Sequence, residues 1–393
     1  MTSDRRKRVA LVVNGAGWAG TERHVRSLVE CLPERGFDVH LITSQDGPLQ
    51  EQAQSAGASV HQVPRRSTIG YGRGLFGLLR ELRPDVIHAH SGRVPLWVAR
   101  LAGVPRIIDT RHGLLERLNP RLQNLGWRWR WEVLKCRAAH QTVTVAKADR
   151  SWLIRAGLPA GRVTTVYNGV PEISGQMGRP SQLTGSGPGV GPSQPARHDS
   201  ANAAGLDIGF DPERPTPIRL GLVGRLAPQK APERAIDLMR YLKQNSTISF
   251  ELVIYGDGEL EGSTLERARD AGVEKSLTWG GVTHDVLSRL RELDLLLLPS
   301  RAEGIPYVLL ESLAVGLPVL STPVGGIPEV LAGAPLNENV LAWEVEPWAE
   351  RVVESTSPGF RERWAEAAAL KMEDFGERSM ISRIVEIYEG RTN

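Results

Sequence analysis

Two runs of alternating strand and helix patterns set the narrowest limits on how this chain can fold. In the first run, apolar segments that suit strands lie at residues 9–14, 39–43, 86–90, 107–110, 142–146 and 163–166. In the second run, they lie at residues 218–223, 250–255, 277–279, 293–298 and 318–321. Helical patterns separate them, for example at residues 21–32, 74–82, 232–242, 259–271, 285–292 and 307–315. Such alternation predicts an α/β fold with two doubly wound parallel sheets, that is, two Rossmann-like domains.

A Gly/Pro/Ser-rich stretch separates the two runs. Fifteen of the 27 residues from Ser174 to Ser200 are glycine, proline or serine, and a packed core cannot be built from them. At 393 residues the chain is also long for one ordinary core. The predicted order is an N-terminal domain at 1–171, a linker or insertion at 172–217, a C-terminal domain at 218–372 and a final amphipathic helix within 373–393.

Cysteine content and hydropathy predict a cytoplasmic protein. Cys31 and Cys136 are far apart in the sequence, which does not suggest a disulfide scaffold and suits a reducing compartment. The first apolar run, at residues 9–13, is too short for a signal peptide. No segment approaches the roughly 20 apolar residues that span a bilayer.

The charge of the chain is divided unequally between its halves. Residues 1–171 contain 26 lysines and arginines against 13 acidic residues, a net charge of +13, whereas the remaining residues carry −10. A basic half attracts anions such as an anionic membrane or a phosphorylated acceptor. The segment Trp127–Trp131 interleaves tryptophan with arginine, which suits a membrane interface or a helix that packs tryptophan into the core. Peripheral membrane contact is therefore expected, and attraction between the two halves is the alternative; we expect no nucleic-acid partner.

Two glutamates follow the fourth strand of the second run. Glu303 lies in the loop after this strand, and Glu311 lies seven intervening residues later in the next helix. Pro306 is expected to start that helix, since proline suits the first helical position. A strand end next to a helix N-terminus normally binds anions. Carboxylates at that place suit the hydroxyl groups of a sugar or a ribose instead.

Two cations occupy the corresponding place after the first strand of the same run. Arg225 and Lys230 precede a helix that Pro232 opens. Together they suit a diphosphate, because arginine provides a planar fork and lysine a point charge. Cations placed beside a leaving group whose negative charge grows stabilise the transition state more than the ground state. The alternative is a pair of solvated surface charges.

Three motifs in this order resemble a known family. They are Glu303-x7-Glu311 followed by Pro323–Val330, the segment Gly224-Arg225-Leu-x3-Lys230, and Val166–Val170. The chain resembles the retaining, nucleotide-sugar-dependent glycosyltransferases of the GT-B fold, in the group 1 or family 4 class. The resemblance implies two Rossmann-like domains that face each other across a cleft, with the last helix crossing back to the N-terminal domain. It also implies transfer from a UDP- or GDP-sugar to a saccharide or lipid-linked acceptor in the synthesis of cell-surface polysaccharide or glycolipid.

The resemblance assigns roles to individual residues. Glu303, Arg225, Lys230 and His112 are the expected catalytic residues, with Glu303 and His112 at the transferred sugar. Glu311 is expected to bind the donor ribose. The remaining expected donor-site residues are Gly17, Gly20, Gly224, Gly304, Ile305, Pro306 and Tyr307. Glu22 and His90 are expected on the acceptor side.

The chain departs from the family pattern at some positions. Some of its residues also allow other interpretations of its function. The family has glycine at the positions of Ala19, Ala231 and Pro306. Gly15-Ala-Gly17-Trp-Ala-Gly20 also matches the dinucleotide fingerprint G-x-G-x-x-G, so an NAD-dependent oxidoreductase is one alternative. The acidic residue that this fingerprint requires at the end of the second strand is missing. A nucleotide-sugar 2-epimerase of the same fold is the other alternative.

Neither an Asp-x-Asp motif nor a Cys/His zinc spacing occurs in the sequence. We therefore expect no metal site and no cofactor, with the nucleotide sugar as a substrate.

Overall fold

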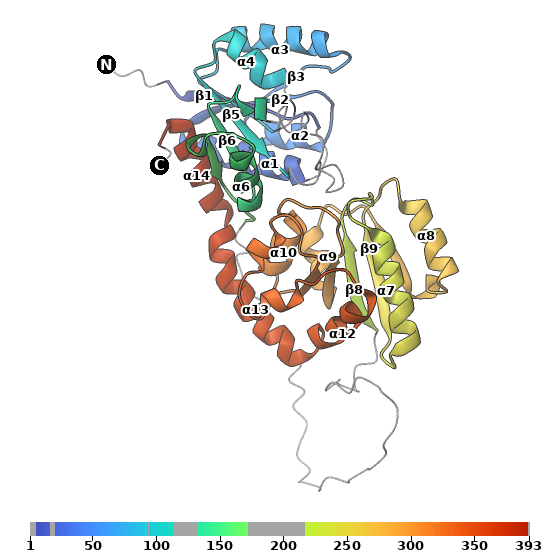
Figure 1. The fold of residues 1–393 in the computed structure, drawn as a ribbon. Coiled ribbons are helices and arrows are strands. Elements are labelled where there is room, and N and C mark those ends of the chain that lie inside the picture. Colours follow the sequence, from blue (N-terminus) through green and yellow to red (C-terminus); the bar gives the residue numbers. More distant parts are fainter. Residues whose placement is uncertain are drawn as a thin grey trace, which may run out of the picture.

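Two parallel sheets organise the computed structural model (Figure 1). The structure describes residues 5–15, 20–90, 92, 94–113, 133–134, 136–171 and 217–391. Gly17, the segment Trp127–Trp131 and almost all of the predicted linker 172–217 therefore lie outside the described residues. Within them, the doubly wound α/β prediction is confirmed for both halves of the chain.

The N-terminal sheet has the strand order β3-β2-β1-β4-β5-β6-β7 among the described residues, with every pair parallel. Its strands are β1 (Lys7–Val12), β2 (Phe37–Thr43), β3 (Ser59–Gln62), β4 (Val86–Ala89), β5 (Arg106–Arg111), β6 (Gln141–Thr144) and β7 (Val163–Thr165). Its helices are α1 (Gly20–Cys31), α2 (Pro48–Ser55), α3 (Thr68–Leu82), α4 (Val94–Ala102) and α6 (Lys147–Arg155). The strand order reverses between β1 and β4, which is where such sheets bind ligands.

The C-terminal sheet has the order β10-β9-β8-β11-β12 and is also parallel. Its strands are β8 (Ile218–Val223), β9 (Phe250–Tyr255), β10 (Leu277–Gly281), β11 (Leu295–Leu298) and β12 (Val319–Ser321). Its helices are α7 (Pro232–Asn245), α8 (Glu261–Asp270), α9 (Val286–Arg291), α10 (Tyr307–Ala314), α11 (Ile327–Val330), α12 (Val345–Ser355) and α13 (Pro358–Met372). Here the order reverses between β8 and β11.

Several boundaries differ from the sequence prediction. Strand β3 was not predicted, and α3 begins six residues before the predicted start at residue 74. Pro306 was expected as the first residue of α10 but is its N-cap, because its ψ of 135° is extended. Ala231, at the N-cap of α7, has φ 51°. This left-handed conformation favours glycine, which is the residue that the family pattern has there.

The last helix, α14 (Glu377–Glu389), packs against the N-terminal domain (Figure 1). Its apolar side contributes Met380, Ile381, Ile384, Ile387 and Tyr388 to the core cluster that also contains strands β1 and β2. The hydroxyl group of Tyr388 lies 2.7 Å from Nδ1 of His88 at the centre of the N-terminal sheet. The chain also passes so close to Gly169 that an added Cβ would lie 2.7 Å from the Cα of Glu377.

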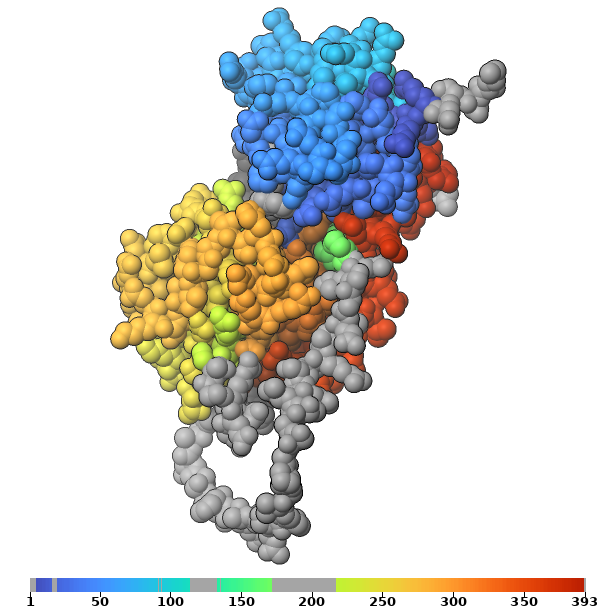
Figure 2. All heavy atoms as spheres, turned by 180° about the vertical axis from the view of Figure 1, so that it is seen from behind, coloured from blue at the N-terminus to red at the C-terminus, as the bar shows by residue number. Residues whose placement is uncertain are grey.

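Further contacts join the two domains beside this helix, and the space-filling view shows them packed against each other (Figure 2). The carboxylate of Glu329, on α11, accepts hydrogen bonds from the backbone N–H groups of Lys147 and Ala148 at 2.9 and 2.8 Å. These N–H groups lie at the start of α6 and have no partner within their own helix. The side chain of Asn168 donates to the carbonyl oxygen of Ile305 at 2.9 Å.

Among the described residues, no helix combines the length and the apolar character that crossing a membrane requires.

Candidate functional site

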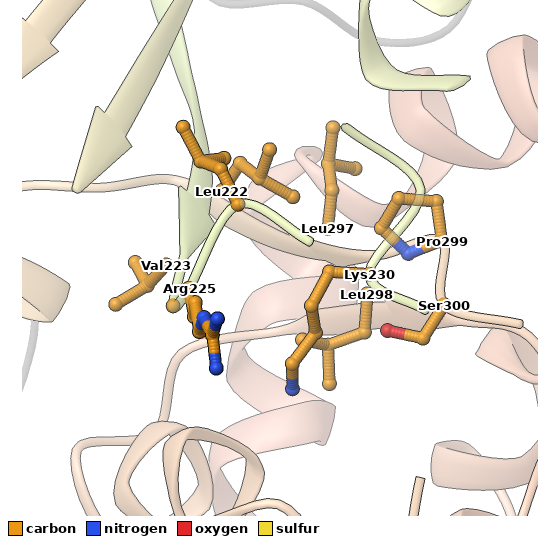
Figure 3. Close-up of a pocket in the computed structure, with 10 residues that line it drawn as sticks. Leu222, Val223, Arg225, Lys230, Leu297, Leu298, Pro299 and Ser300 are labelled. Atoms are coloured by element: carbon orange, nitrogen blue, oxygen red, sulfur yellow. The ribbon is translucent and has the colours of Figure 1, made fainter. Parts of the chain in front are cut away.

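A pocket lies at the reversal point of the C-terminal sheet, where β8 and β11 end (Figure 3). It has an empty volume of about 240 Å³ and is lined by residues 222–226, Lys230 and residues 297–300. The chain turns sharply after β8 at Gly224, whose φ of 138° favours glycine. Figure 3 shows the side chains of Arg225 and Lys230 extending in the same direction from the two ends of this turn. The two predicted phosphate-binding cations therefore share one pocket.

Lys230 contacts the first of the two predicted glutamates. Its Nζ lies 2.6 Å from Oε1 of Glu303, and the hydroxyl group of Ser300 donates to the same oxygen at 2.6 Å. The side chain of Glu303 is only 4% exposed, so this ion pair is shielded from water. The pairing places a cation suited to phosphate beside a carboxylate suited to sugar hydroxyls. Ser300 was not predicted, although its place two residues after the end of β11 was a usable signal.

The loop that carries Glu303 is held from behind by two glycines. A Cβ on Gly325 would overlap with the carbonyl group of Glu303, and one on Gly326 would overlap with the side chain of Ile305. The N–H group of Gly326 donates to the carbonyl oxygen of Gly304 at 2.8 Å. The backbone of the predicted donor loop is therefore fixed by close packing that only glycine allows.

Glu311 forms an ion pair with Arg23, which lies on α1 of the opposite domain. Only one carboxylate oxygen takes part, because Oε2 is buried and has no hydrogen-bond partner among the described residues. Burial raises the pKa of Glu311, and the nearby Arg23 guanidinium opposes that effect. The hydroxyl group of Tyr307 is likewise buried without a partner in the described part of the chain. Two unused polar atoms therefore lie close together on α10.

Gly15 and Gly20, the two described glycines of the predicted glycine-rich segment, belong to the N-terminal domain. The carboxylate of Glu22 covers Gly15 so closely that a Cβ on that glycine would overlap with Oε1. Burial raises the pKa of Glu22, and its Oε2 has no hydrogen-bond partner within the described ranges. Gly20 begins α1, and a Cβ there would lie 3.5 Å from the ring of Tyr307. The predicted Gly20 thus faces the donor-side helix α10, whereas Glu22 packs against Gly15 of its own domain.

Four histidine rings form a cluster at the carboxyl ends of β4 and β5. His88 and His90 are two residues apart at the end of β4, and their ring centroids are 4.1 Å apart. Nδ1 of His90 lies 3.2 Å from Nε2 of His112, and the ring of His24 lies 4.9 Å from that of His112. His24, which was not predicted, also lies 3.2 Å from the side-chain oxygen of Asn168.

Burial controls the ionisation of this cluster. It lowers the pKa of His24 to about 4, since the charged form loses its hydration. Burial also lowers the pKa of His88 and His90 well below 6.5, and neighbouring histidines add to the effect. His24, His88 and His90 are therefore neutral at pH 7, and these three rings can donate and accept hydrogen bonds without adding charge.

No group of histidine, cysteine, aspartate or glutamate side chains within the described residues has a geometry suited to a metal ion.

Comparison with known proteins gives consistent matches to both halves of the chain. Residues 18–172 match the family described as Glycosyltransferase Family 4, and residues 209–352 match Glycosyl transferases group 1. The UDP-Gal:alpha-D-GlcNAc-diphosphoundecaprenol alpha-1,3-galactosyltransferase of Escherichia coli is 25% identical over 321 residues, which cover 78% of this chain and 77% of that protein. The putative glycosyltransferase EpsF of Bacillus subtilis is 25% identical over an alignment that covers 97% of this chain and 96% of EpsF.

Solved structures share the two-domain arrangement. HepE from Anabaena in complex with UDP-glucose matches with a TM-score of 0.76 and 16% sequence identity, over 98% of this chain and 99% of HepE.

Proposed function

Since this chain belongs to family 4 of the group 1 glycosyltransferases and has the GT-B fold, we propose that it moves a sugar from a nucleoside-diphosphate donor to a saccharide or lipid-linked acceptor with retention of configuration. The chain is an enzyme of glycosyl transfer. The diphosphoundecaprenol-linked GlcNAc named for the E. coli relative supports a lipid-linked acceptor. UDP is the nucleotide named both for that relative and for HepE, which supports a UDP-sugar over a GDP-sugar.

One observation carries the proposal: the 2.6 Å contact between Lys230 and Glu303 beside the pocket that Arg225 also lines. It brings the two expected halves of a donor site, cations for the diphosphate and a carboxylate for the sugar, to one place. The side chain of Glu303 is only 4% exposed. A lysine that served only as a solvated surface charge would not need such a buried carboxylate as its partner.

In the proposed reaction, one glycosidic bond replaces another. The bond between the anomeric carbon and the phosphate oxygen breaks, and the bond to the acceptor oxygen forms on the same face of the sugar. The proton of the acceptor hydroxyl passes to the leaving phosphate oxygen. Negative charge grows on the diphosphate as the first bond breaks, and Arg225 and Lys230 stabilise that charge. Glu303 then accepts hydrogen bonds from the sugar hydroxyls in place of its contact with Lys230.

The ribose has a site of its own in this proposal. Oε2 of Glu311 is buried and unused, so it can accept a hydrogen bond from a ribose hydroxyl group while Arg23 keeps Oε1. A buried acceptor without a partner costs about 1–3 kcal/mol, and a donor hydroxyl group would remove that cost.

We expect UDP to raise the melting temperature of the protein more than GDP does. A ligand at 100 times its Kd adds about 2.7 kcal/mol to folding stability. Glu311→Gln should reduce the shift, because an amide oxygen accepts a hydrogen bond more weakly than a carboxylate does. Glu350→Gln, an exposed change on α12, is the matched control and should keep the full shift. If a panel of nucleoside diphosphates and nucleotide sugars gives no shift at all, the donor-site assignment is wrong.

We also expect transfer activity to survive dialysis against EDTA. The reason is the pair of cations, Arg225 and Lys230, that already lines the pocket where the diphosphate charge would develop. The measurement is the rate of sugar transfer before and after chelation. Loss of activity that Mg²⁺ or Mn²⁺ restores would contradict the expectation.

A further inference from the structure

Helix α3 presents two opposite faces. Tyr71, Leu75 and Leu79 are buried in the N-terminal core, at spacings of four residues. Ile69, Arg73, Phe76 and Arg80 follow one another at spacings of four, three and four residues on the opposite side, and all are exposed. Such spacing places them in one stripe along the helix. Ile69 is 72% exposed and Phe76 40%, so the outer stripe combines apolar side chains with arginines.

Helix α4 continues this surface. Trp97 and Leu101 are four residues apart and are 45% and 77% exposed. The two helices pack directly against each other, since a Cβ on Gly72 of α3 would lie 3.7 and 3.9 Å from the side chains of Val94 and Val98. Figures 1 and 2 show both helices at the end of the N-terminal domain that lies away from the C-terminal domain. Their outer residues, Ile69, Arg73, Phe76, Arg80, Trp97 and Leu101, are called the α3–α4 face below.

The charge around this face is positive. Arg65 and Arg66 precede α3, Arg83 follows it, and all three are exposed. Within the described part of the chain, none of these three arginines, nor Arg73 or Arg80, forms an ion pair. Glu81 is the one acidic residue between positions 65 and 83. It follows Arg80 directly, so it lies about 100° around the helix from the outer stripe.

We propose that the α3–α4 face docks the protein on an anionic membrane surface. Exposed aromatic and aliphatic residues among arginines suit the boundary between lipid headgroups and acyl chains. The unpaired arginines fit headgroup phosphates, which accept hydrogen bonds from the guanidinium fork. A second copy of the chain fits less well, because two such faces would bring arginines of like charge together. The proposal does not depend on the identity of the donor, and its test uses no transfer assay.

The full chain is expected to float with vesicles of three parts phosphatidylcholine to one part phosphatidylglycerol, and not with phosphatidylcholine alone. Each arginine near an anionic leaflet strengthens binding about fivefold, so Arg73→Glu/Arg80→Glu should weaken it by at least ~25-fold. The matched control is Arg269→Glu/Arg291→Glu, two exposed sites of the C-terminal domain with the same change in net charge. Control and test variants that lose binding equally would show that only the total charge matters, and would overturn the proposal.

The apolar residues require a second arm at a moderate salt concentration, at which the arginine contribution is weakened but vesicle binding persists. Phe76→Ser/Leu101→Ser should remove most of the binding that remains there, while Leu370→Ser, at a site that is 71% exposed on α13, should not. Two other results would overturn the proposal. One is binding that is lost on changing Arg128 and Arg130 to glutamate and is unaffected by changes in the α3–α4 face. The other is absence of vesicle binding together with a dimer in size-exclusion chromatography that Phe76→Ser/Leu101→Ser abolishes.

Discussion

Replacing Lys230 by alanine is expected to lower the turnover number about a hundredfold while the two-domain fold persists. Loss of one preorganised contact to a charge that develops in the transition state costs about 3 kcal/mol. Arg225→Ala should have an effect of the same order, since both side chains line the same pocket. The measurement is steady-state transfer from the donor that gives the largest thermal shift.

Stability has to be separated from catalysis in this experiment, because Lys230→Ala leaves the buried Glu303 without its cation. Breaking a buried ion pair destabilises a protein by roughly 3–5 kcal/mol. Lys230→Ala/Glu303→Gln should recover part of that stability without recovering turnover. Lys243→Ala removes a lysine of the same domain that donates a hydrogen bond to the carbonyl oxygen of Gly272, and should leave turnover unchanged. Near-normal turnover in both Lys230→Ala and Arg225→Ala would contradict the assigned roles.

Acidification from pH 7 to pH 5 is expected to destabilise the N-terminal domain through its histidines. The unfolded chain binds protons near pH 6.5, whereas the pKa of folded His24 is about 4 and those of His88 and His90 are also far below 6.5. The folded state therefore binds fewer protons than the unfolded state in this range. The contribution of these histidines to the free energy of unfolding is therefore complete above pH 6.5, and it is lost as the pH falls towards their pKa in the folded protein. At pH 5 His24 accounts for about 2 kcal/mol, and His88 and His90 act in the same direction.

Two carboxyl groups have the opposite effect, because they stabilise the folded protein as the pH falls. The pKa of Glu22 and that of Glu311 are raised by burial, so the folded state takes up their protons before the unfolded state does. A difference between variants isolates the histidines. His24→Gln should reduce the loss of stability between pH 7 and pH 5 by about 2 kcal/mol, measured from thermal unfolding at both pH values. The exposed His284 gives the control His284→Gln, and equal pH dependence in all three proteins would refute the expectation.

The core strands could be predicted from the sequence, because their residues are buried on both faces of the sheet and form continuous apolar runs. Strand β3 lacks that signal: it lies at the sheet edge, and no residue in Ser-Val-His-Gln is fully buried. The positions of the charged residues after β8 and β11 were also predictable, because the strands that precede them were, whereas their chemical roles stay a prediction. Arg225, Lys230, Glu303 and Glu311 occupy fixed places relative to strand ends.

Contacts across the domain interface were beyond the reach of the sequence. Arg23 and Glu311 are 288 positions apart, and nothing in local spacing indicates that α1 and α10 meet. The same holds for His24, which joins His90 and His112 only because α1 packs over the ends of β4 and β5. The pair Arg23–Glu311 depends on how the two domains are oriented, whereas the contacts of His24 depend on how α1 packs within the N-terminal domain.

The helix α14 has a consequence for how the protein is made. Its residues Met380, Ile381, Ile384, Ile387 and Tyr388 belong to the core of the N-terminal domain, yet the ribosome synthesises them more than 200 positions after Val170. At roughly 5–20 residues per second, the first domain waits on the order of ten to forty seconds for this segment. During translation its β1–β2 side exposes the apolar surface that α14 later covers. We therefore expect nascent chains of this protein to be prone to aggregation until synthesis of α14 is complete.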